Sequence, residues 1–296
     1  MELDSAYLCH RPLLLSIAYR MLGSVSDAED LVQDVFFIAR KWEENEEGDH
    51  VRNLKAYLCK VVTNRCLDFL KSARKQREVY VGPWLPEPLV QYDTNESGQD
   101  PLQTIILEDT ISYAFLILLD QLTPVERAVF ILREAFDYDY RDIADMIGKT
   151  ELGCRKIYSR LKRKIQAEPD TSQTDEAKSE ELVHRFLHAA STGNMQALVA
   201  TLTEDITVYT DGGGKVHAAT HPIRTIPRVA AFVLGLSSKM DGQTRIRSAR
   251  INGTIGLIIG SIGDRYNAVI SFQIEADGIR NMYILRNPDK LRHLNL

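Results

Sequence analysis

Five polar side chains, four of them basic, recur along one side of a helix predicted over residues 151–165. Arginine and lysine neutralise DNA phosphates and bond the edge of guanine, and serine bonds phosphates or base edges. The apolar residues of the segment, Cys154, Ile157, Leu161 and Ile165, fall on the other side. The basic face therefore suits contact with duplex DNA. Its members are Arg155, Lys156, Ser159, Arg160 and Arg163.

The residues before this helix predict the partner that a DNA-reading helix needs. Ile143, Ala144 and Ile147 form an apolar face in residues 140–147, and Gly148 follows as a turn residue. Two helices joined by a short turn, with a basic second helix, are typical of a helix-turn-helix. In that motif the N-terminal half of the second helix lies in the major groove and contacts base edges.

A second basic face is predicted on a helix over residues 52–75. Lysine suits phosphate contact and asparagine suits base edges. A solvated basic face without a ligand explains the same pattern, so both interpretations stay open. The apolar side is formed by Leu54, Tyr57, Leu58, Val61, Val62, Cys66 and Phe69. The candidate contacts on the outer side are Asn53, Lys60, Asn64, Lys71 and Lys75.

A third predicted helix, residues 26–42, is acidic on its outer face and is expected to begin with a capping box of Ser26 and Glu29. Carboxylates near a helix N-terminus stabilise its dipole by about 0.3–1 kcal/mol, which explains part of the acidity. Phe37 among them is not explained in this way and indicates a protein interface, although an isolated exposed aromatic often has no role. The candidate partner-binding residues are Asp27, Asp30, Gln33, Asp34 and Phe37.

Charge along the chain is strongly segregated behind a net charge of −5. Residues 26–49 carry nine acidic and two basic side chains, residues 52–77 eight basic and one acidic, and residues 149–164 seven basic and one acidic. Two separate basic stretches in an acidic protein indicate two nucleic-acid contacts.

The four cysteines, Cys9, Cys59, Cys66 and Cys154, show neither paired spacing nor metal-ligand spacing. We expect free buried thiols in a reducing cytoplasm, with no metal and no cofactor. The sequence has no signal peptide and no apolar run near 18 residues, so a cytoplasmic protein without membrane contact is expected.

The order of elements predicts two all-α domains followed by an α+β domain. The expected division is residues 1–76, a linker at 77–104, residues 105–166, a linker at 167–178, and residues 179–296. In the last domain we expect helices at 178–192, 195–201 and 222–238, a strand at 205–210, and four strands within 243–287. The first linker contains a segment too apolar for a spacer, which we expect to dock on another part of the chain. Its residues are Trp84, Leu85, Pro86, Glu87 and Pro88.

On these motifs, residues 1–166 resemble the extracytoplasmic-function (ECF) sigma factors of bacterial RNA polymerase, which keep the two helical domains called region 2 and region 4. The acidic helix resembles their polymerase-binding segment, the helix at 52–75 the one that melts and reads the −10 element, and the helix-turn-helix the −35 reader. The recognition helices of that family usually begin with small polar residues, whereas this one has Leu152, Gly153 and Cys154.

The last 115 or so residues resemble the SnoaL/NTF2-like cone fold, and the whole chain resembles the sigma factors that carry this extension. Three motifs support the match, the first being the Trp84–Pro88 segment. The second comprises Asp211, Gly212, Gly213, Gly214 and Lys215. The third comprises Asn287, Pro288, Asp289, Lys290 and Leu291.

The resemblance implies a promoter-specificity subunit that performs no catalysis. Its expected partners are the clamp of core RNA polymerase and promoter DNA. Whether the C-terminal domain also binds an unknown small-molecule ligand stays open. That domain is expected to regulate the sigma regions in cis, with its two motifs contacting the Trp84 segment and region 2.

Two other functions remain as alternatives. The first is an ordinary helix-turn-helix regulator with a ligand-sensing domain, in which the acidic helix and the first basic helix have no role. The second is catalysis by the C-terminal domain, since its fold also houses isomerases and cyclases. Such an enzyme needs a pocket with a perturbed acid or base, for which Tyr209, Asp211, His217 and His221 are candidates.

Overall fold

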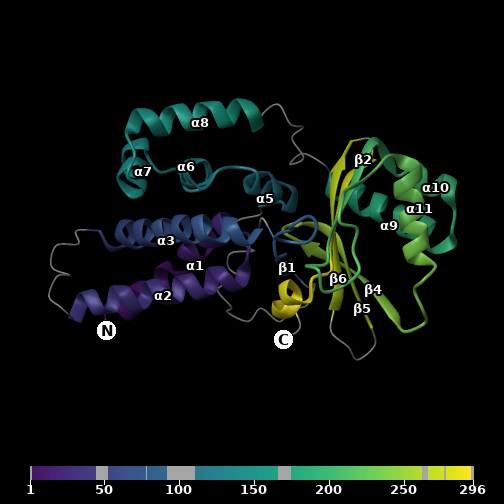
Figure 1. The fold of residues 1–296 in the computed structure, drawn as a ribbon, viewed down its shortest axis with the longest axis horizontal. Coiled ribbons are helices and arrows are strands. Elements are labelled where there is room, and N and C mark those ends of the chain that lie inside the picture. The colour runs from purple at the N-terminus through teal and green to yellow at the C-terminus, as the bar shows by residue number, and fades with distance from the viewer. Residues whose placement is uncertain are drawn as a thin grey trace. The chain divides into compact units, whose positions relative to one another are not determined.

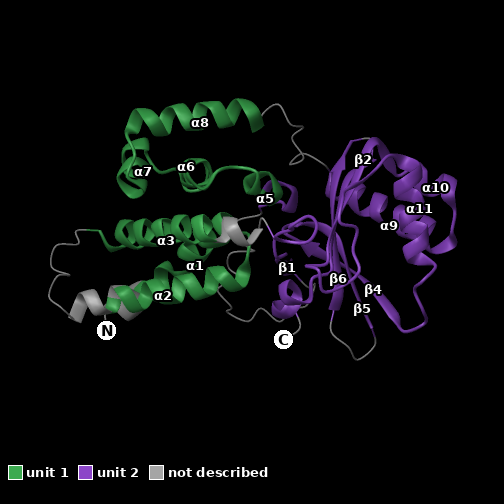
Figure 2. Ribbon diagram, viewed as in Figure 1, with its two compact units in different colours: residues 1–78, 96–109, 116–168 green, residues 79–95, 110–115, 169–296 purple. Residues whose placement is uncertain are grey.

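The structure, a computed structural model, describes residues 2–44, 53–77, 79–91, 111–165, 175–261, 266–276 and 278–294. The chain divides into two compact units (Figure 2). Unit 1 holds residues 1–78, 96–109 and 116–168, and unit 2 holds residues 79–95, 110–115 and 169–296. Residues 79–91, which the sequence predicts to be part of a linker, thus belong to the same unit as the C-terminal domain.

Unit 1 is helical (Figure 1), and the helices predicted over residues 26–42, 52–75 and 151–165 are present with ends that differ by at most two residues. The N-terminal group packs α1 against both α2 and α3. Helix α6 packs against α1 and α3, and α7 packs against α3. One helix, α5, begins in unit 2 and ends in unit 1. The bounds are α1 (Glu2–Leu22), α2 (Val25–Glu44), α3 (Leu54–Arg77), α5 (Tyr113–Asp120), α6 (Pro124–Glu134), α7 (Tyr140–Ile147) and α8 (Glu151–Ile165).

Local signals fix several of these helix ends. Thr123 is the N-cap of α6 and forms a capping box, because it accepts from the backbone of Glu126 and the Glu126 carboxylate accepts from the backbone of Thr123. Gly148 ends α7 in the left-handed conformation, with φ of 65°. Helix α2 starts one residue earlier than predicted, and Ser24 Oγ, 3.1 Å from the Asp27 backbone nitrogen, accepts its hydrogen bond.

A buried arginine joins the two groups of helices in unit 1. Arg127 of α6 is 3% exposed. Its Nη1 donates to the backbone oxygen of Met21, at the end of α1, at 2.6 Å, and its Nη2 donates to Asp120 at 2.9 Å. A buried guanidinium must be hydrogen-bonded to be tolerated, so these partners fix how α6 meets α1.

Two burial predictions for unit 1 are wrong. Phe69 is 37% exposed. Because α6 and α7 also pack on α3, the buried side of that helix includes Cys59, Leu67 and Leu70 instead. Cys9 is exposed, since it precedes the fully buried part of α1 that begins at Leu14. The other three cysteines are buried as predicted, and burial raises the pKa of the Cys66 thiol.

Unit 2 is a seven-stranded sheet with helices packed on one face (Figure 1). The strand order is β1-β4-β5-β6-β7-β2-β3, with β2 parallel to β7 and the other neighbours antiparallel. The helices are α9 (Glu176–Thr192), α10 (Met195–Val199) and α11 (Ile226–Ser237). The strands are β1 (Val90–Gln91), β2 (Leu202–Asp211), β3 (Ile223–Arg224), β4 (Thr244–Ile251), β5 (Thr254–Ser261), β6 (Tyr266–Glu275) and β7 (Gly278–Leu285), followed by the 3-10 helix η3 (Pro288–Leu294).

Strand alternation separates the face of the sheet that packs on the helices from the opposite face in unit 2. Ile206 and Val208 of β2 and Phe272 of β6 belong to the buried cluster with the helices, and the rings of Phe186 and Phe272 meet edge to face with centroids 5.6 Å apart. Tyr209 and Asp211 alternate with these residues along β2, so their side chains lie on the opposite face of the sheet.

The sheet also includes a strand from the predicted linker. β1 pairs antiparallel with β4, with Val90 opposite Ile251 and Gln91 opposite Arg250. Asn252 in the β4–β5 turn extends this pairing: its Oδ1 accepts from the Leu89 backbone at 3.0 Å, and its own backbone donates to the Leu89 oxygen at 2.8 Å.

One feature near the sheet differs from the sequence prediction, and another agrees with it. The helix expected from residue 222 begins at Ile226, because residues 223–224 pair with β2 as β3. The four strands expected within 243–287 are confirmed as β4 to β7.

Candidate functional site

The outer face of α2 lies open in unit 1. Asp30, Gln33, Asp34 and Phe37 are exposed, and Asp27 is half-buried. The Phe37 side chain is 51% exposed, with its ring centroid 5.9 Å from that of Phe36. An exposed ring supported by a second aromatic and flanked by carboxylates is suited to anchoring a protein partner.

The predicted contacts on α3 have different local roles. Asn53 caps the helix, since its Oδ1 accepts from the Ala56 backbone at 3.1 Å. Asn64 Nδ2 donates to the Lys60 oxygen at 3.0 Å and to the Met146 oxygen at the end of α7 at 2.9 Å. Lys60 and Lys71 are exposed, and Lys71 pairs with Asp68 at 2.8 Å. The side chain of Lys75 lies outside the described residues.

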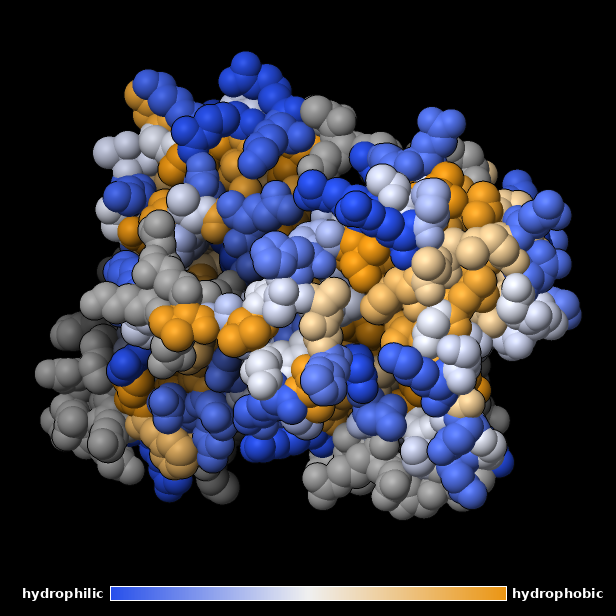
Figure 3. All heavy atoms as spheres, turned by 45° about the vertical axis from the view of Figure 1, so that its right-hand side comes forward, coloured by the Kyte–Doolittle hydropathy of each residue, from blue (hydrophilic) through white to orange (hydrophobic). Residues whose placement is uncertain are grey.

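The basic face of α8 is exposed as predicted, but its cations are not equivalent. Arg155 donates to Glu151 and lies over the Tyr140 ring, 5.0 Å from its centroid. Arg160 pairs with Glu126 of the α6 capping box. A shallow depression on this surface is lined by Arg155, Lys156, Ile157, Ser159, Arg160 and Arg163. In Figure 3 the top of unit 1, where α8 lies, is mostly hydrophilic.

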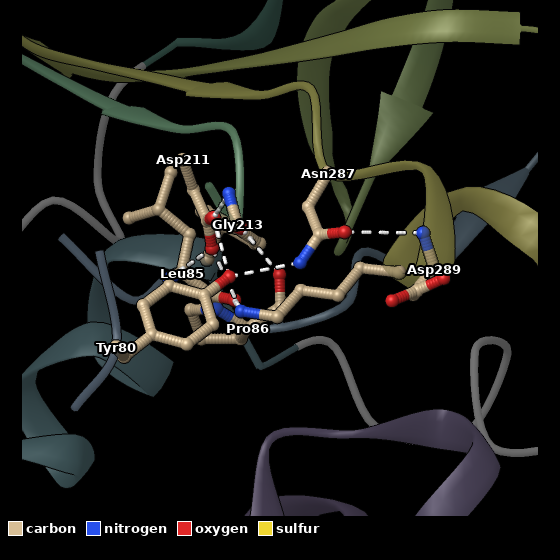
Figure 4. Close-up of polar contacts among 9 residues, drawn as sticks. Tyr80, Leu85, Pro86, Asp211, Gly213, Asn287 and Asp289 are labelled. Carbon is tan, nitrogen blue, oxygen red and sulfur yellow. Dashed lines mark hydrogen bonds and ion pairs between the residues drawn. The ribbon is translucent and has the colours of Figure 1, made fainter. Parts of the chain in front are cut away.

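The Trp84 segment and the two motifs of the C-terminal domain meet around one carboxylate, in what we call the Asp211 cluster (Figure 4). Asp211, at the end of β2, has no exposed surface. Its Oδ1 accepts from the Tyr80 hydroxyl at 2.6 Å and from the Gly213 backbone at 3.0 Å. Its Oδ2 accepts from the Leu85 backbone at 2.9 Å and from Lys290 Nζ at 2.7 Å. These donors satisfy a buried carboxylate that would otherwise be strongly unfavourable.

Lys290 completes the charge balance of the cluster. Its ammonium also donates to the Leu85 oxygen at 2.7 Å. It lies 4.1 Å from the ring centroid of Trp84 and 4.9 Å from that of Tyr80, within cation–π range. Burial, together with the adjacent Asp211 carboxylate, raises the pKa of Tyr80, so its phenol remains protonated and donates to that carboxylate.

Asn287 and the glycines shape the cluster's other side. Asn287 Nδ2 donates to the Tyr80 hydroxyl at 2.9 Å, and its Oδ1 accepts from the Asp289 backbone at 3.1 Å. Gly213 has φ of 60°, and a side chain there would collide with the Asn287 amide. Lys215 pairs with Asp289 at the exposed rim of the cluster.

Further contacts fix the rest of the Trp84 segment to unit 2. The Tyr113 hydroxyl donates to the Pro86 oxygen at 2.6 Å, and His293 Nε2 lies 2.8 Å from the Pro88 oxygen. Residues 85–89 are all buried, including Glu87 at 6% exposure.

The residues proposed for catalysis are not gathered in one place. Asp211 is enclosed by its donors, whereas His217 and His221 are exposed and Tyr209 stacks on Tyr283, with centroids 5.5 Å apart. Among the described residues, no group of His, Cys, Asp and Glu could hold a metal ion. Sequence reasoning did not identify Tyr80, Tyr113 or Asn252, because single polar residues without a periodic neighbour give no signal.

Comparisons with known proteins decide the family. Residues 6–76 match the Sigma-70 region 2 family, and residues 114–165 match the Sigma-70, region 4 family. The chain is 30% identical to the ECF RNA polymerase sigma factor SigJ of Mycobacterium tuberculosis over 95% of its own length and 90% of that relative. It belongs to the ECF RNA polymerase sigma factor family.

Other relatives agree with this assignment. The sigma factor is 31% identical to the probable ECF RNA polymerase sigma factor SigI of M. tuberculosis over 97% of its chain and 94% of the relative. The crystal structure of M. tuberculosis SigJ aligns with a TM-score of 0.75 at 28% identity, covering 97% of each chain. The match extends through the C-terminal domain, so the predicted helical sigma domains followed by an α+β domain are confirmed.

As a sigma subunit, the protein recognises promoters for RNA polymerase, and core polymerase and promoter DNA are its partners. No described helix has the length and apolar character needed to cross a membrane.

Proposed function

We propose that this sigma factor binds the clamp of core polymerase through the outer face of α2 and reads promoter DNA through α3 and α8. Exposed Phe37 beside Asp30, Gln33 and Asp34 supports the first contact. Exposed Lys60 and Lys71 on α3 supply phosphate contacts next to the −10 bases, which are held unpaired and splayed out. The exposed basic face of α8 supplies the −35 contact.

We further propose that the C-terminal domain regulates the sigma regions in cis by holding the segment that connects them. The observation that carries this proposal is the buried Asp211 carboxylate, which accepts from Tyr80 and Leu85 of that segment and from Lys290 of the C-terminus. A surface spacer would leave such groups hydrated. Here the connecting segment instead contributes to the core of unit 2.

Unit 2 holds this connection at both ends. Helix α3 ends at Arg77, and residues 79–91 are already part of unit 2. At the other end, residues 110–115 belong to unit 2, and α5 then continues into unit 1. The Tyr113–Pro86 hydrogen bond ties the two ends together. Holding both ends limits the separations that region 2 and region 4 can adopt on a promoter.

A transcription assay with core polymerase and a cognate promoter tests this regulation. Trp84→Ala and Lys290→Ala should change promoter-dependent transcript yield while leaving affinity for core polymerase unchanged, because neither residue lies on α2, α3 or α8. Lys215→Ala is the matched control: it removes a lysine of the same motifs whose ion pair with Asp289 is half-exposed and of little energetic weight.

Parental transcript yield from both the Trp84 and the Lys290 variants, at normal protein levels, would contradict the proposal. Failure of the parent protein to direct core polymerase to any promoter would instead favour the ordinary helix-turn-helix regulator.

A further inference from the structure

The recognition helix carries an exposed leucine where a polar residue would be expected. Leu152 is the second residue of α8 and is 62% exposed, among the most exposed large apolar side chains of the described residues. An apolar side chain of this size in water gains nothing for the fold. It is also not required to start the helix, because Thr150 Oγ1 accepts from the Gly153 backbone at 3.1 Å.

Helical geometry places Leu152 on the face that points away from the domain core. Successive residues of an α-helix are rotated by about 100° around its axis. Four side chains of α8 point within about 40° of the direction opposite to buried Cys154. Cys154 and Leu161 are 0% and 2% exposed, which fixes the inner side. The four outward residues are Leu152, Lys156, Ser159 and Arg163.

Two other cations of α8, Arg155 and Arg160, lie at the sides of this face and are already engaged. Arg155 is held by Glu151 and by the Tyr140 ring, and Arg160 is held by Glu126. Within the described part of the chain, Lys156 makes no hydrogen bond or ion pair, and Arg163 makes only a long one, 3.4 Å, to the Ser159 oxygen. The outward face therefore presents one apolar group in the first turn and unengaged cations behind it.

We infer that Leu152 is a specificity-determining residue that packs against the C5-methyl group of a thymine in the −35 element, with Lys156 bonding an adjacent base edge. The N-terminal turns of a recognition helix enter the major groove. There the thymine methyl is the one apolar feature of the base edges, and an apolar side chain distinguishes it from the other bases. This inference rests on the proposed role of α8 as the −35 reader.

Uracil in place of thymine tests the inference, since it removes only the methyl group. The holoenzyme, formed from the full chain and core polymerase, first selects a −35 duplex from random sequences. The probes are copies of that duplex in which one thymine at a time is replaced by deoxyuridine. At one or more positions the parent should lose about fourfold in affinity, the value of one buried methyl-sized group. Leu152→Ala should show no loss at that position, whereas Leu152→Ile should retain most of it.

Leu8→Ala serves as the matched control, because it removes a leucine of α1 that is 67% exposed and lies outside the faces proposed to bind DNA or polymerase. It should discriminate thymine from uracil as the parent does, while thermal unfolding verifies that each variant is folded. A parent that binds every uracil duplex as tightly as the thymine duplex, or a selected element without thymine, overturns the inference. So does a Leu152→Ala variant that keeps the parental discrimination. A holoenzyme that selects no promoter would instead contradict the proposed function.

Discussion

Asp211 and Lys290 form a buried ion pair whose charges are both saturated by hydrogen bonds. The side chains are 0% and 9% exposed, and Nζ lies 2.7 Å from Oδ2. Such a pair contributes little net stability compared with apolar residues, yet removing one partner leaves an uncompensated charge. The pair therefore makes the docking of the Trp84 segment specific, because Leu85 can donate to Oδ2 only when that segment lies in one position.

Removing one charge of this pair should destabilise unit 2. Asp211→Asn should lower the free energy of unfolding by about 3–5 kcal/mol, since Lys290 would remain buried without its counter-charge. Adding Lys290→Met should recover part of the loss, because the unpaired ammonium is then absent. Denaturant unfolding of the full chain measures both effects. A double variant less stable than Asp211→Asn would contradict this account.

The glycine motif allows a second test at the residue scale. Gly213→Ala should destabilise the protein by more than about 1 kcal/mol, because φ of 60° disfavours a side chain and the new methyl group would meet the Asn287 amide. Gly235→Ala in α11, where nothing lies within 4 Å, is the control and should stabilise by about 0.5–1 kcal/mol. The two melting temperatures, measured on the full chain, should shift in opposite directions.

At the scale of elements, α2 separates folding from partner binding. Its inner residues Val32 and Val35 have no exposed surface, whereas Asp34 and Phe37 are exposed. Asp34→Ala with Phe37→Ala should thus shift the melting temperature by no more than about 2–4 °C, since each surface change alters stability by under about 0.5 kcal/mol. The same pair should weaken core polymerase binding at least tenfold, measured by competition with the parent. Unchanged affinity would place the polymerase contact elsewhere.

The packing of α3 against α7 in unit 1 bears on how the −10 element is read. Asn64, a candidate base reader, donates to the Met146 oxygen of α7. Both hydrogens of this amide are thus used, on the Lys60 and Met146 oxygens. If Asn64 is the −10 reader that we propose, its Nδ2 can donate to a base only after one of these hydrogen bonds breaks.

For the whole molecule, local signals predicted the helices and sheet strands well, and long-range pairing was largely hidden. Thr123 with Pro124 fixed the start of α6, and the periodicity of Ile143, Ala144 and Ile147 fixed the inner face of α7. β1 was missed because two residues beside a proline-rich segment show no alternation, and they become a strand only by pairing with β4.

The Asp211 cluster shows the same limit. The sequence identified the three motifs and predicted that the two in the C-terminal domain contact the Trp84 segment. It could not indicate Tyr80, whose hydroxyl lies between Asp211 and Asn287, residues far from it in the chain. Which polar atoms pair at such distances depends on the completed sheet, so only a structure assigns them.

The hold of unit 2 on both ends of the connecting segment leads to a prediction about promoter spacing. Tyr113→Phe keeps the ring against Tyr283, at 5.7 Å between centroids, and deletes only the hydroxyl that bonds the Pro86 oxygen. Leaving a buried carbonyl unpaired costs about 1–3 kcal/mol, which weakens the tie between the two ends. We expect transcription from promoters with −10 to −35 spacing one base pair off the optimum to rise severalfold relative to the optimal spacing. Tyr283→Phe is the matched control, because it removes a hydroxyl that bonds Gln273 within the sheet at 3.1 Å and leaves the hydrogen bond between Tyr113 and Pro86 in place. Transcript yields across a spacing series that change equally in both variants would show that the Tyr113 bond stabilises unit 2 without setting the distance between the DNA-reading regions.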